Sequence, residues 1–137
     1  INQWIKSSSG GQFNKLSMEF LLGQIFRLFA FMIGINWNET VLVGSLLGQK
    51  FVLNEFIAYV NLAEMKASGL LSEKSILIST YALCGFANFS SIAIQIGGIG
   101  SMAPSRQKDI SKLGLRALLA ATLATLLTGN IAGFIIA

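Results

Sequence analysis

Residues 75–105 read SILISTYALCGFANFSSIAIQIGGIGSMAPS, thirty-one consecutive positions without a charged side chain. A continuous helix of that length would be about 46 Å long, whereas the hydrocarbon core of a bilayer is about 30 Å thick. Polar residues gather near its middle, around Asn88. Irregular backbone at membrane depth is tolerated only where it is buried in protein or lines a wet cavity. The segment therefore predicts a transmembrane helix that is interrupted near Asn88, with a candidate substrate site at the interruption.

Composition indicates that lipid surrounds most of this 137-residue chain. Hydrophobic residues make up 53% and charged residues only 12%, about half the charged share of a soluble domain. The basic residues behind the net charge of +4 lie between apolar segments without aromatic interleaving, which is typical of membrane edges rather than of nucleic-acid binding. With no histidine and one cysteine, the chain lacks the residues for a metal cluster or a Cys/His nucleophile pair. We expect an all-α integral membrane protein that is not an enzyme and has no catalytic residue, cofactor or metal site. Cys84 is expected to be a small buried packing residue.

The residues before the uncharged segment predict a linker, an interfacial helix and a hairpin. Residues 1–15 include a Ser/Gly-rich stretch that is typical of a linker from an upstream segment. Residues 16–35 are apolar but carry charges near their centre, which suits a helix at the membrane interface. Residues 38–67 form two short apolar pieces around Gly48-Gln49-Lys50. Neither piece has the roughly twenty residues of a full span, so we expect a re-entrant helical hairpin with its tip at that glycine.

Two transmembrane helices are expected to complete the chain. The broken helix is predicted over residues 72–104, where Pro104 ends it. The final helix is predicted over residues 108–137, because its last twenty-one residues carry no charge. The basic loop before it should lie on the cytoplasmic side. Gly129 and Gly133 permit close helix packing, which we expect within the chain rather than between copies.

Polar residues at membrane depth form the candidate site. Glu55 has apolar neighbours, and a carboxylate there requires a polar cavity, a cation or a hydrogen-bonding ligand. Asn88, Ser91 and Gln95 have helical spacing and share one face, which offers donors and acceptors and suits a neutral hydroxylated solute. The free N–H and C=O groups of a broken helix add fixed polar positions. Together these features predict a sugar-binding site. Two alternatives stay open: Glu55 simply reaches water, and the Asn88 face serves interhelical hydrogen bonding.

Several long motifs, in order along the chain, resemble the concentrative nucleoside transporter family. The likeness runs from about Leu16 onward and matches the C-terminal portion of that family. Two departures lie outside the expected site: Asn36 stands where the family often has proline, and Arg27 lies in a stretch that is commonly less charged. The motifs are Gly44-Ser45-Leu46-Leu47-Gly48-Gln49-Lys50, Asn54-Glu55-Phe56 with Ala58-Tyr59, the run from Thr80 to Ser91, and Gly97-Gly98-Ile99 followed by Met102-Ala103-Pro104 and Arg106.

The resemblance implies half of an inverted-repeat transport domain, made of the interfacial helix, the re-entrant hairpin, the discontinuous transmembrane helix and the final transmembrane helix. It implies a multi-pass transporter in the plasma membrane, which here would be a bacterial inner membrane. The full-length transporter would be a homotrimer in contact with membrane lipid. Its substrate would be a nucleoside, imported by symport with sodium or protons. The resemblance assigns ribose hydrogen bonding to Glu55, Asn88 and Ser91, with Phe86 contacting the nucleoside nearby. It assigns two further roles, recognition of the base and coordination of the coupling ion, to a missing upstream half. That half would adjoin a separate scaffold.

A second hypothesis describes a non-transporting membrane assembly or anchor subunit whose polar residues only pack helices. It predicts that removing the Asn88 or Ser91 side chain lowers stability without changing any solute affinity. Because a ligand that binds the folded state raises its apparent stability, thermal-shift measurements with and without nucleoside distinguish the two hypotheses.

Overall fold

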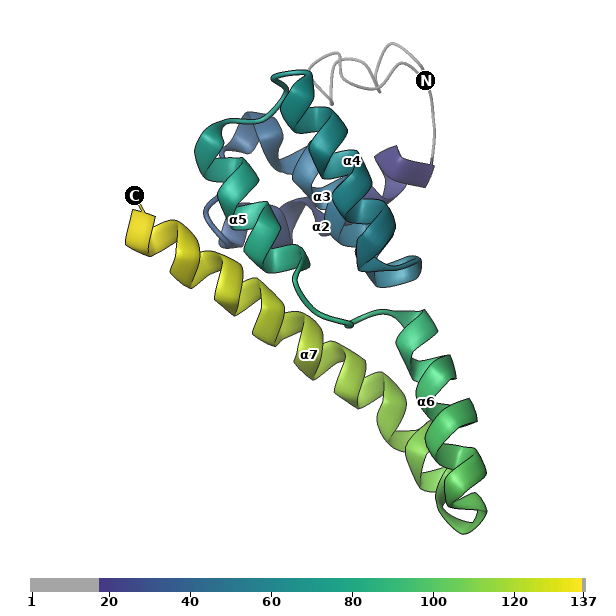
Figure 1. Cartoon of the computed structure of the whole chain (residues 1–137). Coiled ribbons are helices and arrows are strands. Elements are labelled where there is room, and N and C mark those ends of the chain that lie inside the picture. The colour runs from purple at the N-terminus through teal and green to yellow at the C-terminus, as the bar shows by residue number, and fades with distance from the viewer. Residues whose placement is uncertain (1–17, 137) are drawn as a thin grey trace.

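The computed structural model describes residues 18–136, and every regular element in that range is a helix. This confirms the predicted all-α class, while the predicted linker at residues 1–15 lies outside the described residues. Figure 1 shows α2 to α5 clustered together and α6 set apart, with both groups resting on α7. The elements are α2 (Met18–Met32), the 3-10 turn η1 (Trp37–Glu39), α3 (Thr40–Val52), α4 (Glu55–Ala67), α5 (Glu73–Leu83), α6 (Phe89–Met102), the 3-10 turn η2 (Pro104–Arg106) and α7 (Gln107–Ile136).

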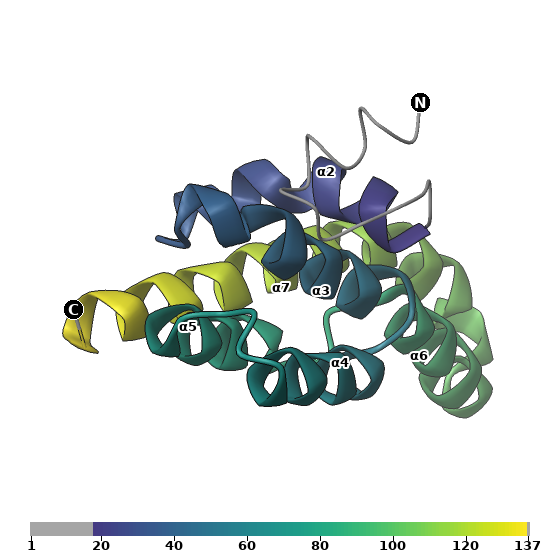
Figure 2. The ribbon, with the colours of Figure 1, turned by 90° about the horizontal axis from the view of Figure 1, so that it is seen from above.

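The 30-residue helix α7 joins the two groups. α5 packs along its C-terminal part and α6 along its N-terminal part (Figure 1, Figure 2). Gly129 makes the α5 contact possible, because a Cβ there would lie 2.9 Å from the Cβ of Ala82 and 3.0 Å from the carbonyl oxygen of Ile78. A Cβ at Gly133 would lie 2.7 Å from the Ile78 side chain. The prediction that these glycines serve packing within the chain is confirmed.

The hairpin of α3 and α4 turns at a different place from the one predicted. α3 continues through Gly48-Gln49-Lys50 as far as Val52, and the turn follows at Leu53 and Asn54. Gly48 packs against α2, because a Cβ there would lie 2.5 Å from the Cβ of Leu22. The predicted tip was wrong because this glycine allows two helices to approach closely and does not reverse the chain.

α3 is surrounded by the other helices, and each of its residues from Thr40 to Lys50 is buried. α2 covers one side at very short range, since a Cβ at Gly44 would lie 2.6 Å from the carbonyl oxygen of Gly23. The core joins α2, α3, α4, α5 and α7, and among its buried members are Ala30, Val43, Leu46, Ala58, Leu62, Ile78, Leu83 and Leu126. This packing fixes the C-terminal end of α3, which leads into the hairpin turn and Glu55.

Arg27, one of the two departures from the family pattern, stabilises the connection between α2 and α3. Its guanidinium carbon lies 3.9 Å from the centroid of the Trp37 ring, and its Nε donates to Oγ1 of Thr40 at 3.1 Å. Asn36, the other departure, precedes η1 and makes no side-chain capping bond. Both departures thus lie on the connection between α2 and α3, and only Arg27 has side-chain contacts that stabilise it.

Residues 75–105 are interrupted where the sequence predicted. α5 ends at Leu83 and α6 begins at Phe89. Gly85 in the connecting loop has a φ of 133°, a conformation that glycine adopts without the steric penalty of a side chain. Cys84 is exposed, so the prediction that it is a buried packing residue was wrong. It lies just beyond the end of α5, where the backbone has left the helical conformation (φ −67°, ψ 111°), and not within the packed part of the helix.

One helix in the described range, Pro104–Ile135, is long and apolar enough to cross a membrane, with a mean hydropathy of 1.8. α6 ends at Met102, just before Pro104, where the sequence predicts the end of the broken helix, and α7 begins at Gln107. Phe20–Met32 and Phe89–Met102 are shorter apolar helices. The interfacial position of α2 and the re-entrant position of the hairpin stay predictions.

Candidate substrate-binding site

The hairpin turn brings Glu55 to the site. Asn54 has extended backbone and caps α4, because its Oδ1 accepts a hydrogen bond from the N–H of Ile57 at 3.0 Å. Glu55 is consequently the first residue of α4, and its side chain is half-buried. The N-terminus of a helix carries a partial positive charge, so this position stabilises the carboxylate.

Asn88 has the equivalent capping position at the start of α6. Its Oδ1 accepts hydrogen bonds from the backbone N–H of Ser91 at 2.7 Å and from the Ser91 hydroxyl at 2.8 Å. The Asn88 side chain is only 2% exposed. Asparagine is among the preferred residues at this position because its oxygen satisfies an N–H that the helix leaves free. The two bonds fix the amide group and leave its Nδ2 for another partner.

That partner is Glu55. Nδ2 of Asn88 donates to Oε2 of Glu55 at 2.8 Å. A second bond joins the same two elements, from the Ser90 hydroxyl to the carbonyl oxygen of Leu53 at 3.1 Å. The structure thus brings Glu55, Asn88 and Ser91 together, with the starts of α4 and α6 meeting at one carboxylate.

These three side chains keep free hydrogen-bonding capacity. In the described part of the chain, Oε1 of Glu55 has no hydrogen-bond partner. The Ser91 hydroxyl gives its proton to Asn88 and keeps its lone pairs, and Nδ2 of Asn88 carries a second N–H. The group can therefore accept hydrogen bonds from hydroxyls and donate one in return. Neighbouring hydroxyls on a sugar ring offer the complementary pattern.

Asn88 and Ser91 also line a cavity of about 100 Å³ between α6 and α7, together with Phe86 and Gln95. Glu55 is not part of its lining. Phe86 is 80% exposed, so its ring is free to contact a ligand. Ligand pockets usually measure about 300–1,000 Å³. The cavity bounded by these residues is therefore smaller than a typical ligand pocket.

A larger cavity of about 350 Å³ lies between α3 and α4 and includes none of the predicted site residues. Gln49 and Asn61 line it, and their side chains are already bonded to each other, from Nδ2 of Asn61 to Oε1 of Gln49 at 2.6 Å. We therefore place the candidate site at Glu55 and Asn88.

Two residues beside the site, Lys50 and Tyr59, were not identified from the sequence. Lys50 Nζ donates to the carbonyl oxygen of Ala82, and the Tyr59 hydroxyl donates to that of Thr80, so both contact the last turn of α5. The signal for Lys50 in the sequence is its charge beside apolar residues, which the predicted hairpin tip at Gly48-Gln49-Lys50 also explains. Nothing in the spacing of Tyr59 distinguishes it from an ordinary packing residue.

A family model described as "Na+ dependent nucleoside transporter C-terminus" matches residues 1–133. This match places the chain in the class of membrane transporters. The break between α5 and α6 and the polar turn of the hairpin are consistent with that class. Within that class the chain belongs to the concentrative nucleoside transporter family, of which it represents the C-terminal portion. The resemblance seen in the sequence is thereby confirmed, as is the prediction that the chain is not an enzyme.

Individual relatives agree with this assignment. The chain is 52% identical over 121 residues to "Uncharacterized transporter YutK" of Bacillus subtilis (strain 168), a match covering 88% of this chain and 30% of that protein. It is 42% identical over 124 residues to "Nucleoside permease NupC" of Helicobacter pylori, with 88% and 30% covered. The chain thus spans about a third or less of the length of these curated relatives.

A solved structure of CNTnw in an inward-facing, substrate-bound state has the same fold. The TM-score is 0.82 and the identity 38%, and the match covers 96% of this chain and 32% of the CNTnw chain. The helix order described above is therefore that of one segment of a larger transporter.

Proposed function

We propose that this chain is the ribose-binding part of a nucleoside:cation symporter that imports nucleosides across the plasma membrane. The observation that carries the proposal is the hydrogen-bonded group of Glu55, Asn88 and Ser91 at the break between α5 and α6. The family description names nucleoside transport and Na+ dependence, and NupC is named a nucleoside permease.

The chemistry of the group favours ribose as the part of the nucleoside that binds here. A ribose presents adjacent hydroxyls, each of which can donate one hydrogen bond and accept others. Oε1 of Glu55 and the lone pairs of the Ser91 hydroxyl would accept from them, and the second N–H of Asn88 would donate to one. Hydrogen bonds to a charged partner contribute about 1.5–3 kcal/mol. In this scheme Phe86 contacts the nucleoside beside the ribose.

The remaining parts of the transporter belong to the upstream half in this proposal. That half would recognise the base and hold the ligands of the coupling ion, sodium or a proton, and it would adjoin the scaffold of a homotrimer in lipid. A multi-pass protein of the bacterial inner membrane fits this arrangement. Because this chain supplies one wall of the site, it is not expected to transport anything alone.

Alternating access requires the grip on the ribose to persist while access to the site changes sides. The bonds from Ser90 to Leu53 and from Asn88 to Glu55 tie α6 to the end of the hairpin. We therefore propose that the hairpin, α5 and α6 move as one unit, which carries the three ribose-binding side chains together.

The test is nucleoside uptake by the full-length protein carrying Glu55→Gln. The variant keeps the shape of the side chain but loses its charge, so uridine kcat/KM should fall by about tenfold or more. Glu64→Gln, an exposed position on the same helix, is the matched control and should behave as the wild type. Wild-type rates in Glu55→Gln at equal surface expression would refute the ribose assignment.

The anchor-subunit hypothesis is tested on the same purified protein. Uridine should raise the unfolding temperature of the wild type and of Glu64→Gln, and should do so much less for Glu55→Gln. An unfolding temperature that no nucleoside changes in the wild type would favour the anchor subunit.

A further inference from the structure

The interrupted helix leaves a C-terminal end of α5 whose carbonyl groups need partners. The last four carbonyls of a helix have no partner within it, and here they belong to Thr80, Tyr81, Ala82 and Leu83. Three of them are satisfied. The Tyr59 hydroxyl donates to Thr80 at 2.7 Å, the N–H of Cys84 donates to Tyr81 at 3.2 Å, and Nζ of Lys50 donates to Ala82 at 2.9 Å.

Lys50 is the one buried charged side chain among the residues whose burial the structure describes, and it is 3% exposed. Its ammonium group has two hydrogen-bond partners, the Ala82 carbonyl oxygen and Oγ1 of Thr125 at 2.8 Å. It therefore contacts α5 and α7 from the last turn of α3. A buried ammonium is unfavourable unless polar groups pair with it, and here the acceptors on α5 and α7 do so.

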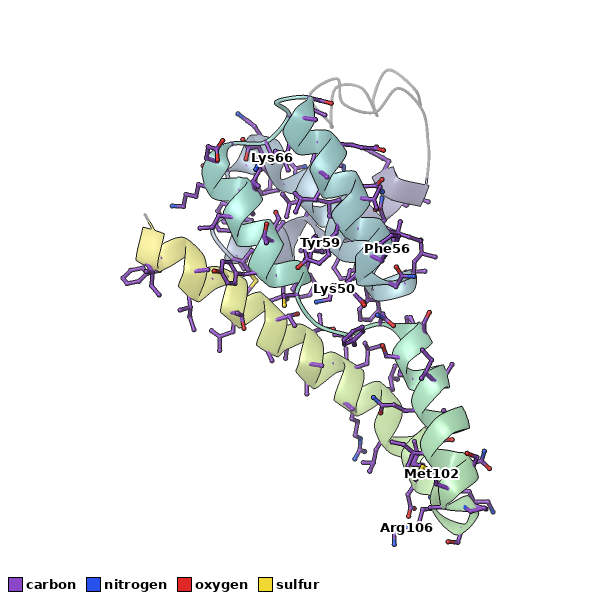
Figure 3. The ribbon with its side chains drawn as sticks, viewed as in Figure 1. Lys50, Phe56, Tyr59, Lys66, Met102 and Arg106 are labelled. Atoms are coloured by element: carbon purple, nitrogen blue, oxygen red, sulfur yellow. The ribbon has the colours of Figure 1, made fainter. Side chains whose placement is uncertain are left out.

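The charges match the polarity of the break. The C-terminal end of α5 is partially negative and the N-terminal end of α6 is partially positive. Lys50 contacts the first of these ends, and Glu55 contacts the second through Asn88. Both residues come from the same hairpin, close to its turn. Figure 3 shows Lys50 beside the loop that joins α5 to α6, with Tyr59 nearby.

We infer that Lys50 is a positioning residue of the candidate site: by holding the end of α5 against α3 and α7, it fixes the loop that carries Asn88 to Glu55. The inference rests on the proposed function for its effect on transport, and on the contacts of Lys50 alone for its effect on the loop. Lys50 makes no direct contact with the ribose in this scheme. Its removal should loosen the grip on the sugar without removing any group that binds it.

The experiment compares uridine with 2′,3′-dideoxyuridine as substrates of the full-length protein. Lys50→Met has a similar length and no charge, and it should lower kcat/KM for uridine by about tenfold while changing that for dideoxyuridine by less than about twofold. The ratio of the two does not depend on expression level. Loss of folded protein alone would lower both rates equally.

Three further variants sharpen the result. Lys50→Arg retains the charge, so its ratio of kcat/KM for uridine to that for dideoxyuridine should lie between those of Lys50→Met and the wild type. Thr125→Val removes one acceptor of the ammonium and should lower the ratio by about threefold, which keeps the test open where Lys50→Met does not fold. Lys66→Met, at an exposed position near the end of α4, is the control and should match the wild type.

A second measurement does not require transport. Hydrogen exchange of the purified protein should become faster over residues 84–91 in Lys50→Met, with an unfolding temperature close to that of the wild type. Faster exchange without any nucleoside uptake by the wild type would support the positioning role and refute the proposed function. Wild-type exchange over this loop would overturn the inference about Lys50, and so would equal losses for the two nucleosides when the rates are compared at equal amounts of folded protein.

Discussion

Asn88 donates a hydrogen bond to Glu55 across 2.8 Å, although the two residues are 33 positions apart in the sequence. The bond joins the cap of α6 to the first residue of α4. Because the same amide also accepts two bonds from Ser91, one side chain connects the start of a helix, the hairpin and the candidate site. Substitutions around it can separate these roles.

Asn88→Asp should strongly reduce nucleoside uptake. The aspartate retains an oxygen for the cap but loses the Nδ2 donor and places a second carboxylate beside Glu55, and like charges at this distance repel. We expect uridine kcat/KM to fall by about tenfold or more. Asn38→Asp, exposed in η1, is the control. Radiolabelled uridine uptake at equal surface expression provides the measurement, and a variant as active as the control would contradict the role of the amide.

Ser91→Ala should mainly weaken the affinity for uridine, whereas Ser90→Ala should mainly lower the stability of the protein. The Ser91 hydroxyl is assigned to the ribose, so its loss should weaken uridine affinity by about tenfold and reduce the preference for uridine over dideoxyuridine. Ser90 ties α6 to Leu53, so Ser90→Ala should lower the stability by about 1 kcal/mol and leave that preference unchanged. Binding isotherms and thermal unfolding of both variants test this, and identical profiles would argue against separate roles.

Gly48→Ala should destabilise the protein through a steric conflict with Leu22. A Cβ at this position lies 2.5 Å from the Cβ of Leu22, and overpacking of this kind destabilises a core by about 1–3 kcal/mol. The double variant with Leu22→Gly removes the Cβ that is approached and should recover part of the loss relative to Leu22→Gly alone. Thermal unfolding of the four proteins in the cycle measures the coupling. Additive effects would show that the two residues are not in contact.

The loop between α6 and α7 should face the cytoplasm. Basic residues follow it on α7, and positive charge beside a membrane span marks the cytoplasmic side. Figure 3 shows Met102 and Arg106 at the end of α6 and α7 that is distant from the other helices. Ser105→Cys, in a full-length variant without other cysteines, should react with an impermeant maleimide only after the cells are opened. Labelling of intact cells would reverse the predicted orientation.

The helix boundaries that were predicted correctly have local physical causes. The break near Asn88 followed from the length of the uncharged segment and the polar residues inside it, and the end of α6 followed from Pro104. The hairpin tip was misplaced because Gly48 has the same appearance in a sequence whether it turns the chain or allows a helix to approach. Only the position of Leu22 in space distinguishes the two.

The candidate site was partly accessible from the sequence for a similar reason. Glu55, Asn88 and Ser91 stand out because polar residues in apolar surroundings require partners. The pairing of Glu55 with Asn88, and the contacts of Lys50 with Ala82 and Thr125, join residues that are distant along the chain. No periodic pattern encodes such contacts, so they became visible only in the folded chain.

The unpaired oxygen of Glu55 has a consequence for the delivery of nucleoside drugs under the proposed function. Fluorine in place of a sugar hydroxyl preserves size but provides no proton for a carboxylate, so fluorinated analogues should enter cells poorly by this route. An amino substituent at the same carbon would provide a proton and a positive charge. Nucleoside drugs meant to enter by this route should therefore keep the sugar hydroxyls intact.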